Sequence, residues 1–308
     1  MGIMDDQNSK NTAASAQLER DRSFSLHPDT RLGSVSLRVA DLARSIEFYE
    51  RALGFHLVDR QPGRAQLGTA GGRTLLMLRE VAGARPMPRR ASGLYHFAIL
   101  VPSRPDLGRA LRRLAEARVP IGEADHLVSE ALYLADPDRN GIEIYRDRPR
   151  DSWKWRGGSV QMAVDPLDLA GILAEGERDA RPDEGLPDGT RIGHLHLQVS
   201  STDEAWEFYC RLLGFSVTSR YQGALFAAAG GYHHHLGLNT WSSLGAPPAP
   251  PEGAGIDAFV IEVPDDEALG RVAERLADAK RPYEAAGSEI TLRDPWNIEV
   301  VIRAAARS

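Results

Sequence analysis

The chain has 308 residues, which is long enough for two domains that each bury a core. Its net charge of −6 at pH 7 and its pI near 5.9 argue against nucleic acid or an anionic membrane as a partner. The single cysteine, Cys210, excludes an internal disulfide and a thiolate metal cluster, and it favours a reducing, cytoplasmic location. No apolar run approaches the roughly 18 residues that a membrane span needs.

Two stretches of the chain repeat each other. A short alternating strand at Ser36 to Val39 precedes a helical pattern at Asp41 to Phe55, and the same order recurs at His196 to Val199 and Thr202 to Phe215. Both helical patterns end in Gly-Phe. The two halves of the chain therefore begin with the same supersecondary unit.

A second repeat is interleaved with the first. An apolar strand from His96 to Pro102 and another from Ala258 to Pro264 each lead into a helical pattern. Each unit then ends in an Asp-Pro turn and a strand that contains Ile-Glu, at Glu143 and at Glu299. We therefore predict an α+β fold of four βαβββ modules, near residues 31–80, 93–147, 192–241 and 255–303.

These modules define the domain boundaries. Residues 1–30 are polar, so we predict a mobile N-terminal tail. Residues 31–147 form the first predicted domain and residues 192–303 the second. Between them, residues 148–191 form a connector that is rich in Pro, Gly and charge, with one helical pattern from Pro166 to Gly176.

Four βαβββ modules of this size resemble the vicinal oxygen chelate superfamily, which includes glyoxalase I, fosfomycin-resistance enzymes, bleomycin-binding proteins and extradiol dioxygenases. The resemblance covers nearly all of residues 31–303. It implies that paired modules form cup-shaped sheets, and that the first and last strands of a module supply metal ligands. The resemblance predicts a fold, whereas the reaction depends on the residues of the site.

At the positions where the resemblance places metal ligands, most of the residues that can bind a metal lie in modules two and three. The first-strand positions of modules one to four are Ser34, His96, His194 and Ala258, and the last-strand positions are Leu76, Glu143, His235 and Glu299. Modules two and three together supply a two-His-one-carboxylate set, namely His96, His194 and Glu143. Such a set suits non-haem Fe(II) and leaves positions open for substrate and oxygen. We therefore predict that module two pairs with module three around the metal, and module one with module four.

The stretch from His126 to Glu143 narrows the resemblance. Its pattern, His, five residues, Leu-Tyr, two residues, Asp-Pro and a later Glu, is similar to the extradiol dioxygenase signature, although Arg139 stands where that family usually has Gly or Pro. The resemblance is closest to two-domain catechol-2,3-dioxygenases of the CatE type. It implies that His126 and Tyr133 lie near the substrate and that His235 acts as the acid/base. The implied substrates are a small aromatic diol and dioxygen, and the implied product is a muconic semialdehyde.

Several alternatives stay open at the level of sequence. A lone strand histidine is more often a hydrogen-bonded core residue than a ligand, and Tyr133 could be a packed aromatic. Strand alternation places His233 and His235 on one face and His234 on the other, which favours His235 without deciding among the three. Mn(II) accepts the same ligands as Fe(II). A glyoxalase-like isomerase or thiol transferase, and a non-catalytic drug-binding module, share the fold. Sheets of this kind also associate, which allows a homo-oligomer.

Overall fold

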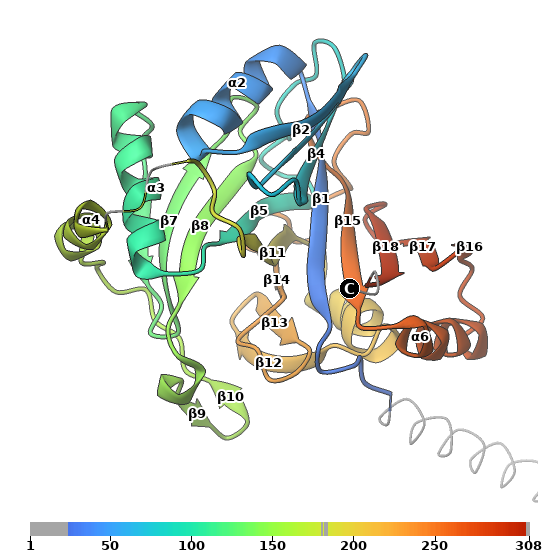
Figure 1. Ribbon diagram of the computed structural model, residues 1–308. Helices are drawn as coiled ribbons and strands as arrows, with labels where there is room; N and C mark the ends of the chain where they lie inside the picture. The colour runs from blue at the N-terminus through green and yellow to red at the C-terminus, as the bar shows by residue number, and fades with distance from the viewer. Residues whose placement is uncertain (1–23, 180, 182–183, 306–308) are drawn as a thin grey trace, which may run out of the picture.

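The computed structural model describes residues 24–179, 181 and 184–305. Most of this part of the chain is built into two eight-stranded mixed sheets with helices packed around them (Figure 1). None of the described helices is long and apolar enough to cross a membrane. The fold agrees with the predicted α+β arrangement of four modules.

The first sheet combines modules one and four. Its order is β16-β17-β18-β15-β1-β4-β3-β2, and β1 pairs antiparallel with β15 at the centre. The strands are β1 (Arg31–Val39), β2 (His56–Gln61), β3 (Arg64–Gly68), β4 (Thr74–Glu80), β15 (Gly255–Val263), β16 (Glu284–Ala286), β17 (Glu289–Arg293) and β18 (Glu299–Ala304).

The second sheet combines modules two and three. Its order is β12-β13-β14-β11-β5-β8-β7-β6, and β5 pairs antiparallel with β11 at the centre. The strands are β5 (Gly93–Leu100), β6 (Gly122–Asp125), β7 (Ser129–Ala135), β8 (Gly141–Asp147), β11 (Arg191–Gln198), β12 (Ser216–Tyr221), β13 (Ala224–Ala228) and β14 (Leu236–Asn239). The predicted pairing of module two with module three is therefore confirmed.

The helices form where the sequence places apolar residues at helical spacing behind a capping side chain. Asp41, Ser103, Ser201 and Asp265 each accept a hydrogen bond from the backbone N–H three residues later. The main helices are α2 (Leu42–Leu53), α3 (Arg104–Glu116), α4 (Leu169–Arg178), α5 (Thr202–Ala205) and α6 (Asp266–Asp278). The helical pattern predicted at 202–215 is only partly α-helical, because α5 runs directly into the π-helix η2 (Trp206–Leu212).

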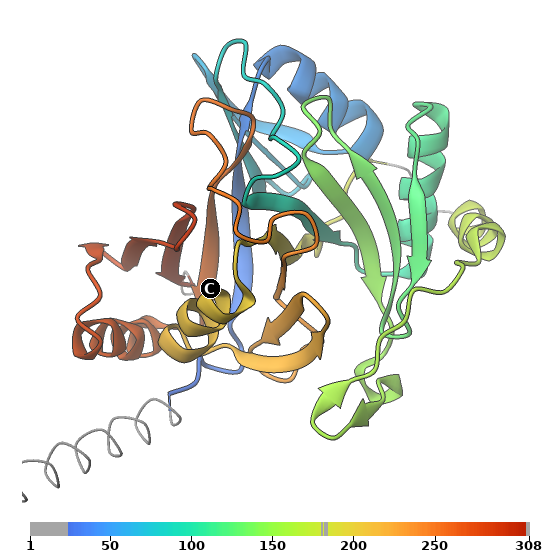
Figure 2. The ribbon, with the colours of Figure 1, turned by 180° about the vertical axis from the view of Figure 1, so that it is seen from behind.

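The connector packs against module two. A short 3-10 helix η1 (Arg150–Ser152) and the hairpin β9 (Trp155–Arg156) and β10 (Ser159–Val160) come first, and the hairpin projects beyond the ends of β7 and β8 (Figures 1 and 2). Helix α4 follows and crosses α3 where Gly108 meets Gly176. A Cβ atom on Gly108 would lie 2.3 Å from the carbonyl oxygen of Ile172, so the close approach requires glycine there.

The last residues of the predicted N-terminal tail are packed against the rest of the protein. Residues 1–23 lie outside the described residues, but Leu26 is buried and its N–H donates to the carbonyl of Gly214. Thr30 is buried as well. The packed part of the chain therefore begins before the predicted boundary at residue 30, because Leu26 is buried next to Gly214 in the second half of the chain.

Two equivalent contacts tie the sheets together. The hydroxyl of Tyr49 in α2 donates to Asp136 Oδ2 at 2.9 Å, and the hydroxyl of Tyr209 in η2 donates to Asp294 Oδ2 at 2.7 Å. The other oxygen of each aspartate accepts two backbone N–H groups of its own turn. Each buried carboxylate thus fixes an Asp-Pro turn and links it to a helix of the neighbouring sheet.

Replacing Tyr49 with Phe should lower the free energy of unfolding by about 1–3 kcal/mol, because the buried Asp136 carboxylate loses a hydrogen-bond donor. Urea unfolding followed by circular dichroism measures the change. Tyr283→Phe is the matched control, since Tyr283 packs on the core and its hydroxyl makes no hydrogen bond with a described residue. Equal stability losses in the two variants would contradict this role of the Tyr49 hydroxyl.

Candidate metal centre

The centre lies on one face of the second sheet, where three neighbouring strands meet. In the register of β11, β5 and β8, His194 stands opposite Ala98, and Ala98 stands beside Glu143. His96 is two residues before Ala98 and therefore shares its face. His194 and Glu143 stand two strands apart, roughly 10 Å at the backbone. The methyl side chain of Ala98 leaves room for the two longer side chains to meet above it.

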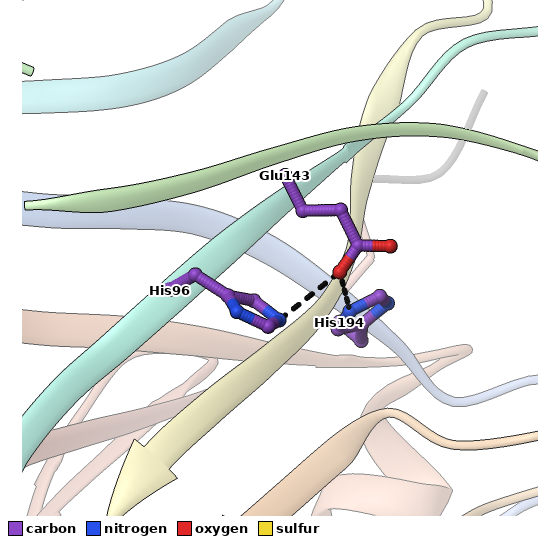
Figure 3. Close-up of side chains that lie close together, drawn as sticks. All are labelled: His96, Glu143 and His194. Atoms are coloured by element: carbon purple, nitrogen blue, oxygen red, sulfur yellow. Dashed lines mark hydrogen bonds and ion pairs between the residues drawn. The ribbon is translucent and has the colours of Figure 1, made fainter. Parts of the chain in front are cut away.

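The three side chains converge on one point. Nε2 of His194 lies 2.9 Å from Glu143 Oε2, and Nε2 of His96 lies 3.0 Å from the same oxygen (Figure 3). One potential ligand atom from each residue lies within 4.8 Å of the others. All three are buried, with exposed fractions of 6% for His96 and 2% for both Glu143 and His194. This His/His/Glu set has the spacing of a divalent metal site.

The electrostatics of the set favour a bound cation. Burial raises the pKa of Glu143, but the electrostatic interaction with the neighbouring His194 and His96 outweighs this effect and holds the pKa well below 4.5. Burial lowers the pKa of His96, although Glu143 partly offsets the effect. A carboxylate beside neutral imidazoles is the protonation state in which a metal binds. Moreover, Nε2 of His96 has no hydrogen bond of normal geometry to any described residue, which leaves its lone pair free for a metal.

The register corrects one equivalence drawn from the sequence. Glu143 is opposite Tyr133 in β7, whereas in module four the strand residue opposite Thr291 is Val301. Glu299 pairs instead with Arg293 and lies two residues earlier in its strand. The counterpart of Glu143 is therefore Val301, and module four has no carboxylate at this position.

The structure places His235 away from the metal centre. The residues from Tyr232 to His235 precede strand β14, which begins at Leu236, so the alternation of a regular strand does not extend to them. His235 Nδ1 accepts from the N–H of Ala229, and its ring contacts Tyr232 and Phe215. The register also makes Leu236, rather than His235, the counterpart of Leu76. A shift of one residue exchanges the two faces of a strand.

His234 lies at the metal centre instead. Its ring centroid is 4.3 Å from that of His194, and the residue lines the cavity above the three ligands. Burial is the main cause that lowers its pKa well below 6.5, and the positive charge that His194 and His233 would carry acts in the same direction. A neutral imidazole therefore faces the cavity.

Tyr133 and His126 form a hydrogen-bonded pair on the cavity wall. The Tyr133 hydroxyl and His126 Nε2 are 2.6 Å apart, and His126 Nδ1 donates to the carbonyl of Ala163 in the connector at 2.6 Å. Because that carbonyl can only accept, a neutral His126 has an unprotonated Nε2, which accepts from the phenol. Burial, followed by the Glu143 charge, raises the pKa of Tyr133 well above 10.0, which keeps the phenol protonated.

The cavity has a volume of about 720 Å³, within the range of small-molecule sites. Neither Lys nor Arg is among the described residues that line it. Several lining residues were not predicted from the sequence. Among them, His196 stands opposite His96, and its Nε2 has no hydrogen-bond partner among the described residues. The alternation His194-Leu195-His196 signalled this position. The missed residues also include Tyr95, Met162, Tyr221, Phe226 and Trp241.

Replacing Glu143 with Gln should weaken binding of a divalent metal by at least about 100-fold, because the set loses its only negative charge. Isothermal titration with Mn(II) measures the affinity directly. Glu299→Gln is the control, since it removes the same charge from a strand of the other sheet that carries no such set. An unchanged affinity in Glu143→Gln would exclude Glu143 as a ligand.

Comparison with known proteins agrees with this architecture. The family model "Glyoxalase/Bleomycin resistance protein/Dioxygenase superfamily" matches residues 31–144 and 191–302. Catechol-2,3-dioxygenase of Bacillus subtilis (strain 168) is 44% identical over 275 residues, which is 88% of this chain and 96% of that protein. Solved structures share the fold at much lower identity. Glyoxalase I of Zea mays superposes with a TM-score of 0.53 at 16% identity, covering 90% of this chain and 92% of the other. A candidate dioxygenase from Bacillus subtilis subsp. subtilis str. 168 superposes with a TM-score of 0.61 at 14% identity, covering 92% and 87%.

The repeated modules, the paired sheets and the buried His/His/Glu set thus agree with the family match over both halves. This chain belongs to the glyoxalase/bleomycin resistance protein/dioxygenase superfamily and is a homologue of catechol-2,3-dioxygenase.

Proposed function

We propose that this protein is an Fe(II)-dependent extradiol dioxygenase that cleaves catechol or a substituted catechol beside the diol and yields a muconic semialdehyde. The main support is the His/His/Glu set at the wall of an apolar cavity, next to the Tyr133–His126 pair. The 44% identical relative is named for the same reaction. The proposal includes a cytoplasmic location, and it is compatible with a homo-oligomer.

His96, His194 and Glu143 would hold the metal. When bound, iron would supply redox and Lewis-acid chemistry, and a set of three protein ligands leaves coordination positions open for substrates. Two neutral imidazoles and one carboxylate leave a net positive charge on a divalent ion, which favours a deprotonated diol. Fe(II) is our assignment within the divalent metals that this set accepts, and Mn(II) is the alternative.

The chain's own residues would handle the substrate protons. A diol must lose a proton to chelate a metal, and we assign its acceptance to Nε2 of His234, in place of His235, because His234 lines the cavity. Tyr133 would hydrogen-bond a substrate oxygen, because its phenol lies in the cavity wall and is held in place by His126.

The remaining walls would orient the ring and exclude water. Tyr95, Phe226 and Trp241 present aromatic surface to the cavity, and Met162 and Val164 of the connector line it as well. A flat, uncharged ring can pack against such walls, whereas an additional anionic group would find no cation among the described lining residues. The connector therefore contributes to the substrate site in addition to linking the domains.

Oxygen uptake tests the proposal. Protein reconstituted with Fe(II) under anaerobic conditions and mixed with catechol in air should consume oxygen and form a yellow product. The His194→Ala variant should lose both the metal and the uptake, because one of three ligands is gone. Bound metal without uptake would contradict the proposal in favour of a glyoxalase-like isomerase or thiol transferase. No bound metal would favour a drug-binding module.

A pair of neighbouring variants tests the acid/base assignment. His234→Ala should retain iron and lose about 100-fold or more in kcat, since a positioned general base contributes about 10²–10⁴-fold. His235→Ala should retain most of the activity, because His235 points away from the cavity. Iron content by mass spectrometry is measured in parallel. The opposite ranking of the two variants would restore the assignment of His235.

A further inference from the structure

A hydrogen-bonded line of side chains runs behind the cavity wall and ends at His234. Nε2 of His233 lies 3.0 Å from Asp147 Oδ1, and Nδ1 of His233 lies 2.8 Å from Nδ1 of His234. Asp147 is the last residue of β8, the strand that carries Glu143. His233 is fully buried, and the Asp147 side chain is 23% exposed. The line therefore joins the edge of the site to its candidate base.

The chemistry of the three groups fixes the direction of each hydrogen bond. An aspartate carboxylate only accepts, so Nε2 of His233 carries the proton that it donates to Asp147. In a neutral ring, Nδ1 of His233 is then a lone pair and accepts from Nδ1–H of His234. A neutral His234 with its proton on Nδ1 has an unprotonated Nε2. That nitrogen makes no hydrogen bond with a described residue.

The surrounding packing holds the line in place. The ring centroid of Trp153, in the connector, lies 5.1 Å from that of His233. The ring centroid of Tyr232 lies 4.1 Å from that of His233. The Tyr232 hydroxyl is 3.1 and 3.0 Å from the two carboxylate oxygens of Asp147. The Thr218 hydroxyl donates to the carbonyl of His233 at 2.6 Å. The two aromatic rings and the bond to Asp147 thus restrict the orientation of the His233 ring.

We propose that Asp147 and His233 are positioning residues that hold His234 in its Nδ1–H tautomer, with the Nε2 lone pair directed at the cavity. The role of His234 as a base rests on the proposed function, whereas its tautomer does not. The arrangement requires two consecutive histidines of different orientation, which accounts for the adjacent His233 and His234 in the sequence. Neither positioning residue needs to touch the substrate.

Nitrogen-15 NMR measures the tautomer without turnover. Protein with labelled histidine, both metal-free and loaded with diamagnetic Zn(II), gives long-range ¹H–¹⁵N spectra that distinguish the two ring nitrogens, and a His234→Gln sample assigns the resonances. We expect His234 to be protonated at Nδ1 and unprotonated at Nε2. Protonation of His234 at Nε2 in the wild-type protein would overturn the proposal.

Variants test the chain of hydrogen bonds. His233→Phe keeps an aromatic ring and removes the acceptor, and Asp147→Leu removes the carboxylate that fixes the His233 proton. In both we expect His234 to populate the Nε2–H tautomer, with kcat lowered about 10- to 100-fold and the KM for catechol changed less than about threefold. Thr218→Val is the control, because it disturbs the same backbone and leaves the imidazoles in contact.

The readouts separate this inference from the proposed function. A protein that fails to cleave catechol but shows the Nδ1–H tautomer in the wild type, lost in His233→Phe, refutes the function and retains the positioning role. A tautomer that persists in both His233→Phe and Asp147→Leu refutes the positioning role, whatever the activity. Equal losses in Thr218→Val would attribute the effect to general disturbance and would likewise refute it.

Discussion

The structure around the site depends on one buried carboxylate. Glu143 is 2% exposed and lies between two imidazoles, at 2.9 and 3.0 Å. An uncompensated charge in that place would cost several kcal/mol. The sheet brings the compensation from two modules at once, because His96 comes from β5 and His194 from β11. The pairing of module two with module three and the protonation state of the site are thus parts of one constraint.

A surrounding set of hydrogen bonds orients several side chains that line the cavity. The carbonyl of Ala163 orients His126, and His126 in turn holds the Tyr133 hydroxyl. On the other side of the cavity, Asp147 and His233 lie behind His234. The connector takes part in both, since Ala163 and Trp153 belong to it. A segment that reads as a linker between domains therefore completes the wall of the site.

The two sheets have equivalent strand orders and differ in their chemistry. The register places Val301 of the first sheet where the second sheet has Glu143. Likewise, Leu75 and Leu76 of the first sheet are the counterparts of His235 and Leu236 of the second. The first sheet thus has apolar residues at these places, and the ion pair of Arg293 with Glu299 is partly exposed. What both sheets share is the link between a tyrosine and a turn aspartate, which joins each sheet to the other.

The sequence by itself determined the modules, their pairing and the three ligands. Helical periodicity, capping residues and Asp-Pro turns are local patterns, and His96, His194 and Glu143 form a set that modules two and three supply together. Only the tertiary structure shows that His234 rather than His235 lines the cavity, that Val301 rather than Glu299 is the counterpart of Glu143, and which contacts the connector makes. These depend on where β14 begins and on the register of β18. A slip of one residue exchanges the faces of a strand, and the contacts that set the register come from distant parts of the chain.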